Sequence, residues 1–220
     1  MLTYLLDVGD LADARFVVSP LNETVLSLFH LNAIHATAHH LAGWRCEANT
    51  RRDEYDRALI DALVSPSGKQ IPDFLTPVTA QADVRPSFEA HLDVVRSTDA
   101  EAARIELVEL AEGGAPGPEL ARLIALDDPA PVIAEALAAY HAAAVAPVWP
   151  AVQRILESDV VFRGRELAVG GPTRLFESLS PRVEWRRTGE LSVDMSCSVV
   201  SGEVRSPGRG LTLMPSVFTT

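Results

Sequence analysis

The spacing of apolar residues changes once along this chain, near Pro181, and that change constrains the fold more than any other feature. Before Pro181, apolar residues recur at helical spacing, as at Leu21, Val25 and Leu28. After it, the segments RVEW, ELSVDMSCSVV and GLTLMPSVF alternate apolar and polar residues, with RTG and SPGRG as turns. The sequence therefore predicts an α+β fold, mainly α, with a helical body over residues 1–180 and a small antiparallel β meander over 181–220. The apolar segment LTYLLDV near the N-terminus is a strand that could join this meander.

The first long helix is expected to begin at Ser19–Pro20, because serine caps a helix and proline suits its first turn. Gly43 marks its expected end. The segment RRDEYDRALIDALVS is expected to form a second amphipathic helix. The segment PSFEAHLDVVRSTDAEAARIELVEL is expected to be helical with a break near residues 97–99.

A later long helical segment is expected to begin at Asp128–Pro129, by the same cap and proline argument. Pro147 and Pro150 should kink or divide it, because proline lacks the N–H that an interior helical hydrogen bond needs. Gly170 and Gly171 are expected to end it.

Composition limits the class of protein. The chain has 220 residues, 47% of them apolar, which is enough for a packed core. No apolar run approaches the ~20 residues of a membrane span, and the N-terminus lacks the basic region and the small-residue cleavage site of a signal peptide. Cys46 and Cys197 lie far apart without metal-type spacing. We therefore expect a cytoplasmic protein with free thiols and no membrane partner.

The charge is strongly acidic and unevenly distributed. The net charge is −11, yet residues 161–220 hold eight arginines against six acidic residues. Residues 1–160 therefore carry a balance of −13, which should repel a phosphate backbone. A sparse basic group lies on the expected β element and its turns, and serves either as edge-strand charge or as a docking face: Arg182, Arg186, Arg187, Arg205 and Arg209.

The histidines of the segment HLNAIHATAHH are the main candidates for a metal-binding site, although the pattern is only a weak indication of one. His35 and His39 are four residues apart and could face one metal ion, with His30 and His40 nearby. No third ligand is evident, and no glutamate lies between the pair as a zincin motif requires. No nucleophile or phosphate-loop motif is present either. We therefore expect no metal, no cofactor and no enzymatic activity. A metal-dependent enzyme using residues 30–40 is the less favoured alternative.

Three aromatic residues are candidates for lining a ligand pocket: Tyr140, Trp149 and Trp44. Tyr140 and Trp149 lie near the bend expected at Pro147 and Pro150, where a helix can curve around a cavity. The alternative is that they are core residues, which large aromatic side chains usually are.

Several segments resemble, in order along the chain, the N-terminal region of actinobacterial ArsR-type winged-helix transcriptional regulators. They are Arg15–Phe16, Ser19–Leu21, Glu23–Val25, PDFLTP at Pro72–Pro77, the segment from VWPAVQRILE to PRVEW, and RGLTLMPSVF. In such proteins a DNA-binding winged helix follows this region. The resemblance implies that the chain stops where that domain would begin.

The expected function is thus an effector-sensing or dimerisation domain of such a regulator, with homodimer formation and a small-molecule effector as the implied interactions. DNA would be bound only through the winged helix beyond residue 220. The alternative is a stand-alone small-molecule-binding or protein-interaction module. The apolar residues of the segment from Asp128 to Gly171 extend around much of the helix, which favours a self-association surface there.

Overall fold

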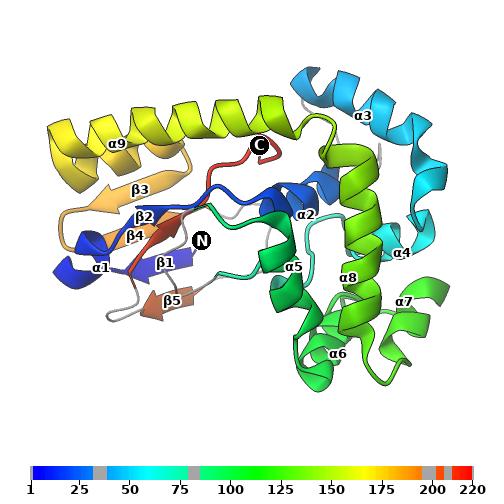
Figure 1. Ribbon diagram of the computed structural model, residues 1–220. Helices are drawn as coiled ribbons and strands as arrows, with labels where there is room; N and C mark the ends of the chain where they lie inside the picture. Colours follow the sequence, from blue (N-terminus) through cyan, green and yellow to red (C-terminus); the bar gives the residue numbers. More distant parts are fainter. Residues whose placement is uncertain (1, 32–38, 79–84, 195–201, 206–209, 220) are drawn as a thin grey trace. The chain divides into compact units, whose positions relative to one another are not determined.

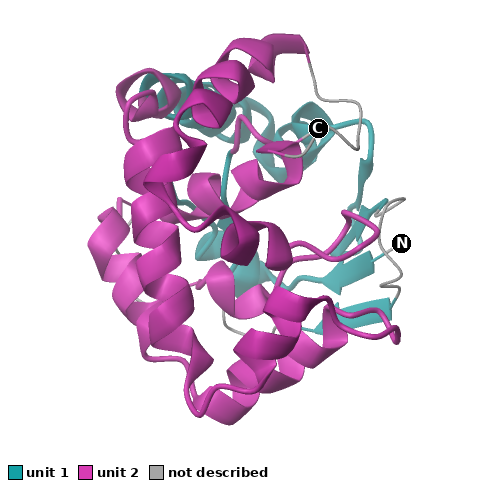
Figure 2. Cartoon of the chain, turned by 90° about the vertical axis from the view of Figure 1, so that its right-hand side faces the viewer, with its two compact units in different colours: residues 1–18, 80–84, 154–215 teal, residues 19–79, 85–153, 216–220 magenta. Residues whose placement is uncertain are grey.

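The computed structural model describes residues 2–31, 39–78, 85–194, 202–205 and 210–219. These residues form the predicted α+β fold, mainly helical with a small sheet. The chain divides into two compact units (Figure 2). Unit 1 comprises residues 1–18, 80–84 and 154–215, and unit 2 comprises residues 19–79, 85–153 and 216–220.

Unit 2 is helical (Figure 1). Its elements are α2 (Pro20–Leu31), η1 (His39–Leu41), α3 (Ala42–Thr50), η2 (Arg52–Glu54), α4 (Arg57–Ala62), η3 (Asp73–Leu75), α5 (Phe88–Arg96), α6 (Ala100–Glu109), α7 (Pro118–Ile124), α8 (Pro129–Tyr140) and the π-helical turn η4 (His141–Val145). The expected start at Ser19 is confirmed, because the Ser19 hydroxyl accepts a hydrogen bond from the Asn22 N–H at 3.1 Å. The break between α5 and α6 is also confirmed, and Asp99 caps α6 there.

Two helix boundaries differ from expectation. Gly43 does not end a helix but lies near the start of α3, and residues 32–38 of the expected first helix lie outside the described residues. The segment RRDEYDRALIDALVS is not one helix. Tyr55 is extended there, and Asp56 then caps the short helix α4 by accepting from the Leu59 N–H at 3.0 Å.

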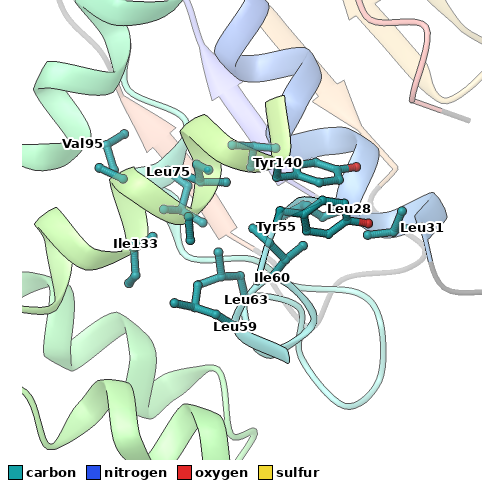
Figure 3. Packing of buried hydrophobic residues seen from close by; sticks show 14 of the residues in the cluster. Leu28, Leu31, Tyr55, Leu59, Ile60, Leu63, Leu75, Val95, Ile133 and Tyr140 are labelled. Carbon is teal, nitrogen blue, oxygen red and sulfur yellow. The ribbon is translucent and has the colours of Figure 1, made fainter. Parts of the chain in front are cut away.

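The core of unit 2 forms where α8 packs against its neighbours, with Tyr55 and Tyr140 side by side among aliphatic residues (Figure 3). The two tyrosine rings meet edge to face, with centroids 5.1 Å apart. The aliphatic residues labelled around them are Leu28, Leu31, Leu59, Ile60, Leu63, Leu75, Val95 and Ile133. Burial of these side chains is the main stabilising contribution to the unit.

The helical segment that begins at Pro129 is divided as predicted near its two prolines. It ends at η4, and the next helix, α9 (Trp149–Leu179), begins beyond Pro147. The expected helix end at Gly170 and Gly171 is confirmed: Gly171, with a φ of 66° and a ψ of −166°, breaks the helix within α9, and a separate helical stretch begins at Pro172. Glycine tolerates this positive φ because it has no Cβ.

Unit 1 contains a four-stranded sheet in the order β3-β4-β1-β5 and a two-stranded sheet, β2-β6. The strands are β1 (Leu2–Leu5), β2 (Arg15–Phe16), β3 (Val183–Arg186), β4 (Glu190–Val193), β5 (Gly202–Arg205) and β6 (Thr212–Leu213), with helix α1 (Val8–Ala12) after β1. The N-terminal strand joins the sheet as expected, but it lies between β4 and β5. It pairs antiparallel with β4 and parallel with β5, so the sheet is mixed instead of a simple meander.

The core of unit 1 lies between the sheet and the C-terminal part of α9 (Figure 1). Leu175 and Phe176 of α9 are buried with Leu6 and Leu191, and the Phe176 ring lies 4.8 Å from the Trp185 ring. The predicted RTG turn joins β3 to β4, and Gly189 adopts a φ of 94° there.

The division into units differs from the expected boundary at residues 180 and 181. Unit 1 takes residues from both ends of the chain, because β1 supplies the inner strand between β4 and β5. It also takes most of α9, because that helix supplies the apolar side chains that cover the sheet.

Candidate functional site

Helix α2 is buried on nearly all sides, yet much of its surface is polar. Buried polar groups are costly unless they are hydrogen-bonded, so the partners of these side chains define the site. The buried polar residues at its start and along it are Ser19, Asn22, Glu23, Thr24, Ser27 and His30.

Ser27 binds the phenol of Tyr140. The Ser27 hydroxyl donates to the Thr24 carbonyl oxygen at 2.7 Å, so its single proton is already used. The Tyr140 phenol, 2.7 Å from Ser27 Oγ, must therefore donate to that oxygen. Burial raises the pKa of Tyr140, which keeps the phenol protonated as this donor role requires.

Thr24 is arranged in the same way with His141. The Thr24 hydroxyl donates to the Pro20 carbonyl oxygen at 2.8 Å, so His141 Nδ1, also 2.8 Å from Thr24 Oγ1, must donate to it. His141 is therefore the neutral tautomer with its proton on Nδ1. Burial lowers the pKa of His141 to about 4, and its ring stacks on Phe88 with centroids 3.8 Å apart.

The hydroxyl–imidazole geometry of Thr24 and His141 is superficially that of a nucleophile and its base. A nucleophilic hydroxyl must donate its proton to the base, whereas the Thr24 proton goes to the Pro20 carbonyl oxygen. The pair is therefore arranged for structure and not for nucleophilic attack. Ser19 and His91 form a second buried hydroxyl–imidazole pair, with Oγ and Nδ1 2.9 Å apart, in which the Ser19 hydroxyl also accepts the capping hydrogen bond from the Asn22 N–H.

Two side chains, those of Trp44 and Arg51, bind carbonyl groups of η4 just before Pro147. A proline has no N–H, so the Ala143 carbonyl four residues earlier cannot receive its usual helical bond. Arg51 Nη1 donates to the Ala143 carbonyl oxygen at 2.8 Å, and Trp44 Nε1 donates to the adjacent Ala144 carbonyl oxygen at 2.8 Å. The π-helical turn η4 is thus capped by side chains from α3 and the residue after it, and the Trp44 ring is fixed in place.

The segment Ser216–Phe218 binds to the residues that this arrangement positions. Glu23 Oε2 accepts from the Val217 N–H at 3.1 Å, and His30 Nε2 donates to the Phe218 carbonyl oxygen at 2.6 Å. The Phe218 ring is only 3% exposed and meets the Trp44 ring edge to face, with centroids 4.7 Å apart. His40 Nε2 lies 3.3 Å from the Val217 carbonyl oxygen and donates to it.

Glu23 is the most unusual group of the site. Its side chain is fully buried, and no group in the described part of the chain hydrogen-bonds its Oε1. Burial raises the pKa of Glu23 to about 7, although hydrogen bonds from the Ser216 hydroxyl and the Val217 N–H act in the opposite direction. Glu23 is therefore largely protonated below neutral pH and readily changes its charge near pH 7.

The three aromatic residues expected to line a pocket have different roles. Tyr140 is a fully buried core residue, Trp44 binds Ala144 and Phe218, and Trp149 is partly exposed at the start of α9. Glu23, Thr24, Ser27 and His141 were not among the site residues expected from the sequence. The alternation of polar and apolar residues in PLNETVLSLFHL is the signal that could have found the first three.

The histidine cluster is only partly described. His35 lies outside the described residues, His39 is exposed, and His30 and His40 bind the backbone of the segment Ser216–Phe218. Over the described ranges, no group of three or more His, Cys, Asp or Glu residues is placed to hold a metal ion.

The basic residues of the sheet have acidic neighbours. Arg186 forms ion pairs with Glu184 and Glu190, each at 3.3 Å, and Arg205 pairs with Glu203 at 3.2 Å. Arg209 lies outside the described residues. Because the pairs offset the arginine charges, this face attracts phosphate groups less than its arginine content suggests.

Comparisons with protein-family models, with curated proteins and with solved structures find no match. In the part of the chain that the structure describes, no single helix is long and apolar enough to cross a membrane. One bent pair, Pro129–Val145 with Trp149–Leu179, satisfies the length and composition together.

Proposed function

We propose that this chain is a regulatory module that pairs as a homodimer and belongs to an ArsR-type winged-helix transcriptional regulator. The resemblance of its ordered sequence segments to the N-terminal region of such regulators supports the regulatory role. A dimer suits that role, because winged-helix and related proteins read two half-sites with two copies.

An exposed apolar stripe on α9 carries the proposal. Ile155, Phe162 and Val169 are 59%, 50% and 65% exposed, and successive members are seven residues apart. Residues at this spacing drift by only about 20° around a helix, so the three side chains share one face. Exposed apolar side chains scattered singly need no explanation, but a row on one helix favours contact with another helix.

The stripe is suited to a second copy of itself. Its spacing is symmetric about Phe162, so a two-fold axis at Phe162 places Ile155 of each copy against Val169 of the other. Asp159 and Glu166 lie beside the stripe, and in such a pair they lie opposite Arg165 and Ser158 of the other copy, so like charges do not meet. Each also forms an ion pair within its own chain, with Arg163 and Arg174 respectively.

Sedimentation velocity on the whole chain tests the pairing. We expect a concentration-dependent dimer, which Phe162→Glu converts to a monomer because it places a charge in the apolar contact. The matched control is Val161→Glu, since Val161 is 73% exposed and adjacent but lies off the stripe. A strict monomer, or equal loss of dimer in both variants, would refute the proposed pairing.

The module itself is not expected to bind DNA specifically. The acidic balance of residues 1–160 and the ion pairs around Arg186 and Arg205 both oppose phosphate binding. Titration of labelled duplexes at moderate salt checks this expectation. Sequence-selective binding by the chain alone would contradict the assignment of DNA recognition to a separate winged helix.

A further inference from the structure

The segment Ser216–Phe218, which bends at Val217 and Phe218, is held in unit 2 by contacts of the kind with which proteins bind short peptides. Side chains, and not a strand or a helix, bind its backbone: Glu23 accepts from one N–H group, and His30 and His40 donate to two carbonyl oxygens. One buried aromatic ring, that of Phe218, is its anchor. Backbone contacts of this kind give affinity, and a single buried ring gives selectivity.

The receiving residues are fixed independently of the segment. Trp44 is oriented by its hydrogen bond to the Ala144 carbonyl oxygen, and Glu23 and His30 are set by helix α2. Glu23 and His30 are seven residues apart, so both project from the same side of that helix. We therefore expect these side chains to keep their positions when the segment leaves the site.

We propose that Glu23, His30, His40 and Trp44 form a binding site for short peptides carrying a Val-Phe pair, and that Ser216–Phe218 occupies it as an exchangeable intramolecular ligand. Burial of one phenylalanine, three hydrogen bonds to the segment's backbone and one from the Ser216 hydroxyl to Glu23 favour docking, whereas ordering of the segment's backbone and side chains opposes it. Such exchange requires that these opposing contributions leave an undocked state that can admit another peptide. This inference is independent of the regulatory role proposed above.

Glu23 gives the site a preference for the peptide backbone. Its Oε2 accepts from the Val217 N–H, while Oε1 has no partner in the described residues. The Phe218 N–H is used within the segment, where it donates to the Ser216 hydroxyl at 3.0 Å. A serine two residues before the phenylalanine is therefore part of the bound conformation, and the ligand class is Ser-Val-Phe.

Competition in trans tests the site. The protein is the full chain with Phe218→Ala, which vacates the ring position, and the probe is a fluorescent peptide of residues 214–220, MPSVFTT. We expect this variant to bind the peptide at least about tenfold more tightly than the unchanged chain, in which the tethered segment competes at high effective concentration. Adding His30→Ala should weaken the binding again, whereas Glu109→Gln, an exposed change on α6 in the same unit, should not.

The control peptide MPSFVTT moves the phenylalanine by one residue and should not compete, because its ring and backbone can no longer be bound together. Failure of MPSVFTT to bind a Phe218→Ala chain that retains the circular dichroism spectrum of the original would overturn the proposal. Equal binding of both peptides would overturn it as well.

A second measurement uses the unchanged chain and decides the question even if the Phe218→Ala variant does not fold. Hydrogen exchange should show the Val217 and Phe218 amides opening locally, at rates insensitive to low denaturant and faster than those of Val25 and Leu28 in α2. Added MPSVFTT should leave the α2 rates unchanged. Exchange of the segment only through global unfolding, together with α2, would show that it is a fixed part of the core.

Discussion

The phenol of Tyr140 donates a hydrogen bond to Ser27 Oγ at 2.7 Å, and the Ser27 hydroxyl donates its own hydrogen bond to the Thr24 carbonyl oxygen. The loss of one hydroxyl therefore affects the hydrogen bonds of the other differently in the two cases. Removing the phenol leaves Ser27 with its donated bond intact, whereas removing the serine hydroxyl leaves a fully buried phenol without this acceptor.

We expect Ser27→Ala to destabilise the protein by about 1–3 kcal/mol, because it leaves the buried Tyr140 donor without its partner. Tyr140→Phe should cost less, about 1 kcal/mol, since it removes only a net hydrogen bond. The double variant should fall short of the sum by an interaction energy of about 1 kcal/mol. Urea unfolding of the four proteins measures this cycle, and strict additivity would contradict the coupling.

Glu23 should make stability fall as the pH rises toward neutrality. Its pKa is raised from 4.5 to about 7 in the folded chain, so the folded state holds the proton more tightly than the unfolded state does. The contribution is fully present below pH 4.5 and is lost as the pH rises through about 7. The loss is on the order of 3 kcal/mol, since one pKa unit corresponds to about 1.4 kcal/mol.

Glu23→Gln keeps the shape of the protonated acid and should remove this dependence, which makes the variant more stable than the original above pH 7. Chemical unfolding at a series of pH values measures the effect. Glu47→Gln, an exposed change on α3, is the matched control and should leave the profile unchanged. A parallel profile for Glu23→Gln and the original would exclude a proton on Glu23.

His141 should act in the opposite direction. Its pKa is lowered from 6.5 to about 4, so the unfolded chain binds the proton more tightly, and stability is lost as the pH falls through that range. Long-range ¹H–¹⁵N correlation spectra should show a neutral ring with its proton on Nδ1 and a titration midpoint near 4. A midpoint close to 6.5, or a proton on Nε2, would contradict the hydrogen bond assigned to Thr24.

Two glycines should respond to alanine in opposite ways. At Gly189, φ is 94° and a Cβ would lie 2.4 Å from the Leu6 carbonyl oxygen, so Gly189→Ala should destabilise unit 1 by more than about 1 kcal/mol. Gly164 lies inside α9 with nothing within 4 Å of an added Cβ. Gly164→Ala should therefore stabilise by about 0.5–1 kcal/mol. Thermal unfolding of both variants checks the difference in sign.

Local signals allowed much of the helical framework to be predicted. The signals at Ser19–Pro20 and at residues 97–99 act through capping bonds within one turn, which a sequence displays directly. Helix α8 begins at Pro129 as predicted, through the proline in its first turn and without a capping bond from the Asp128 side chain. The helix end predicted at Gly43 was wrong, because glycine occurs inside helices as well as at their ends when other residues supply the packing.

The candidate site was harder to predict because its bonds join distant residues. Thr24 meets His141 and Glu23 meets Val217, and no periodicity within α2 identifies such partners. The raised pKa of Glu23 follows from burial on what a helical wheel marks as a polar side. The position of β1 between β4 and β5 could not be predicted either, since the sequence of a single strand does not indicate which strands it will pair with.

The position of β1 has a consequence for how the protein is made. Leu2–Leu5 are synthesised long before their pairing partners, residues 190–193 and 202–205. The buried residues described for the unit 2 core lie between Leu21 and Val145, so that core can assemble on the nascent chain while β1 is still unpaired. The sheet can close only after residue 205 has been synthesised, in a step slowed by the length of chain between its strands. Until that moment the apolar strand β1 is exposed, and it is a target for chaperones that hold unpaired strands.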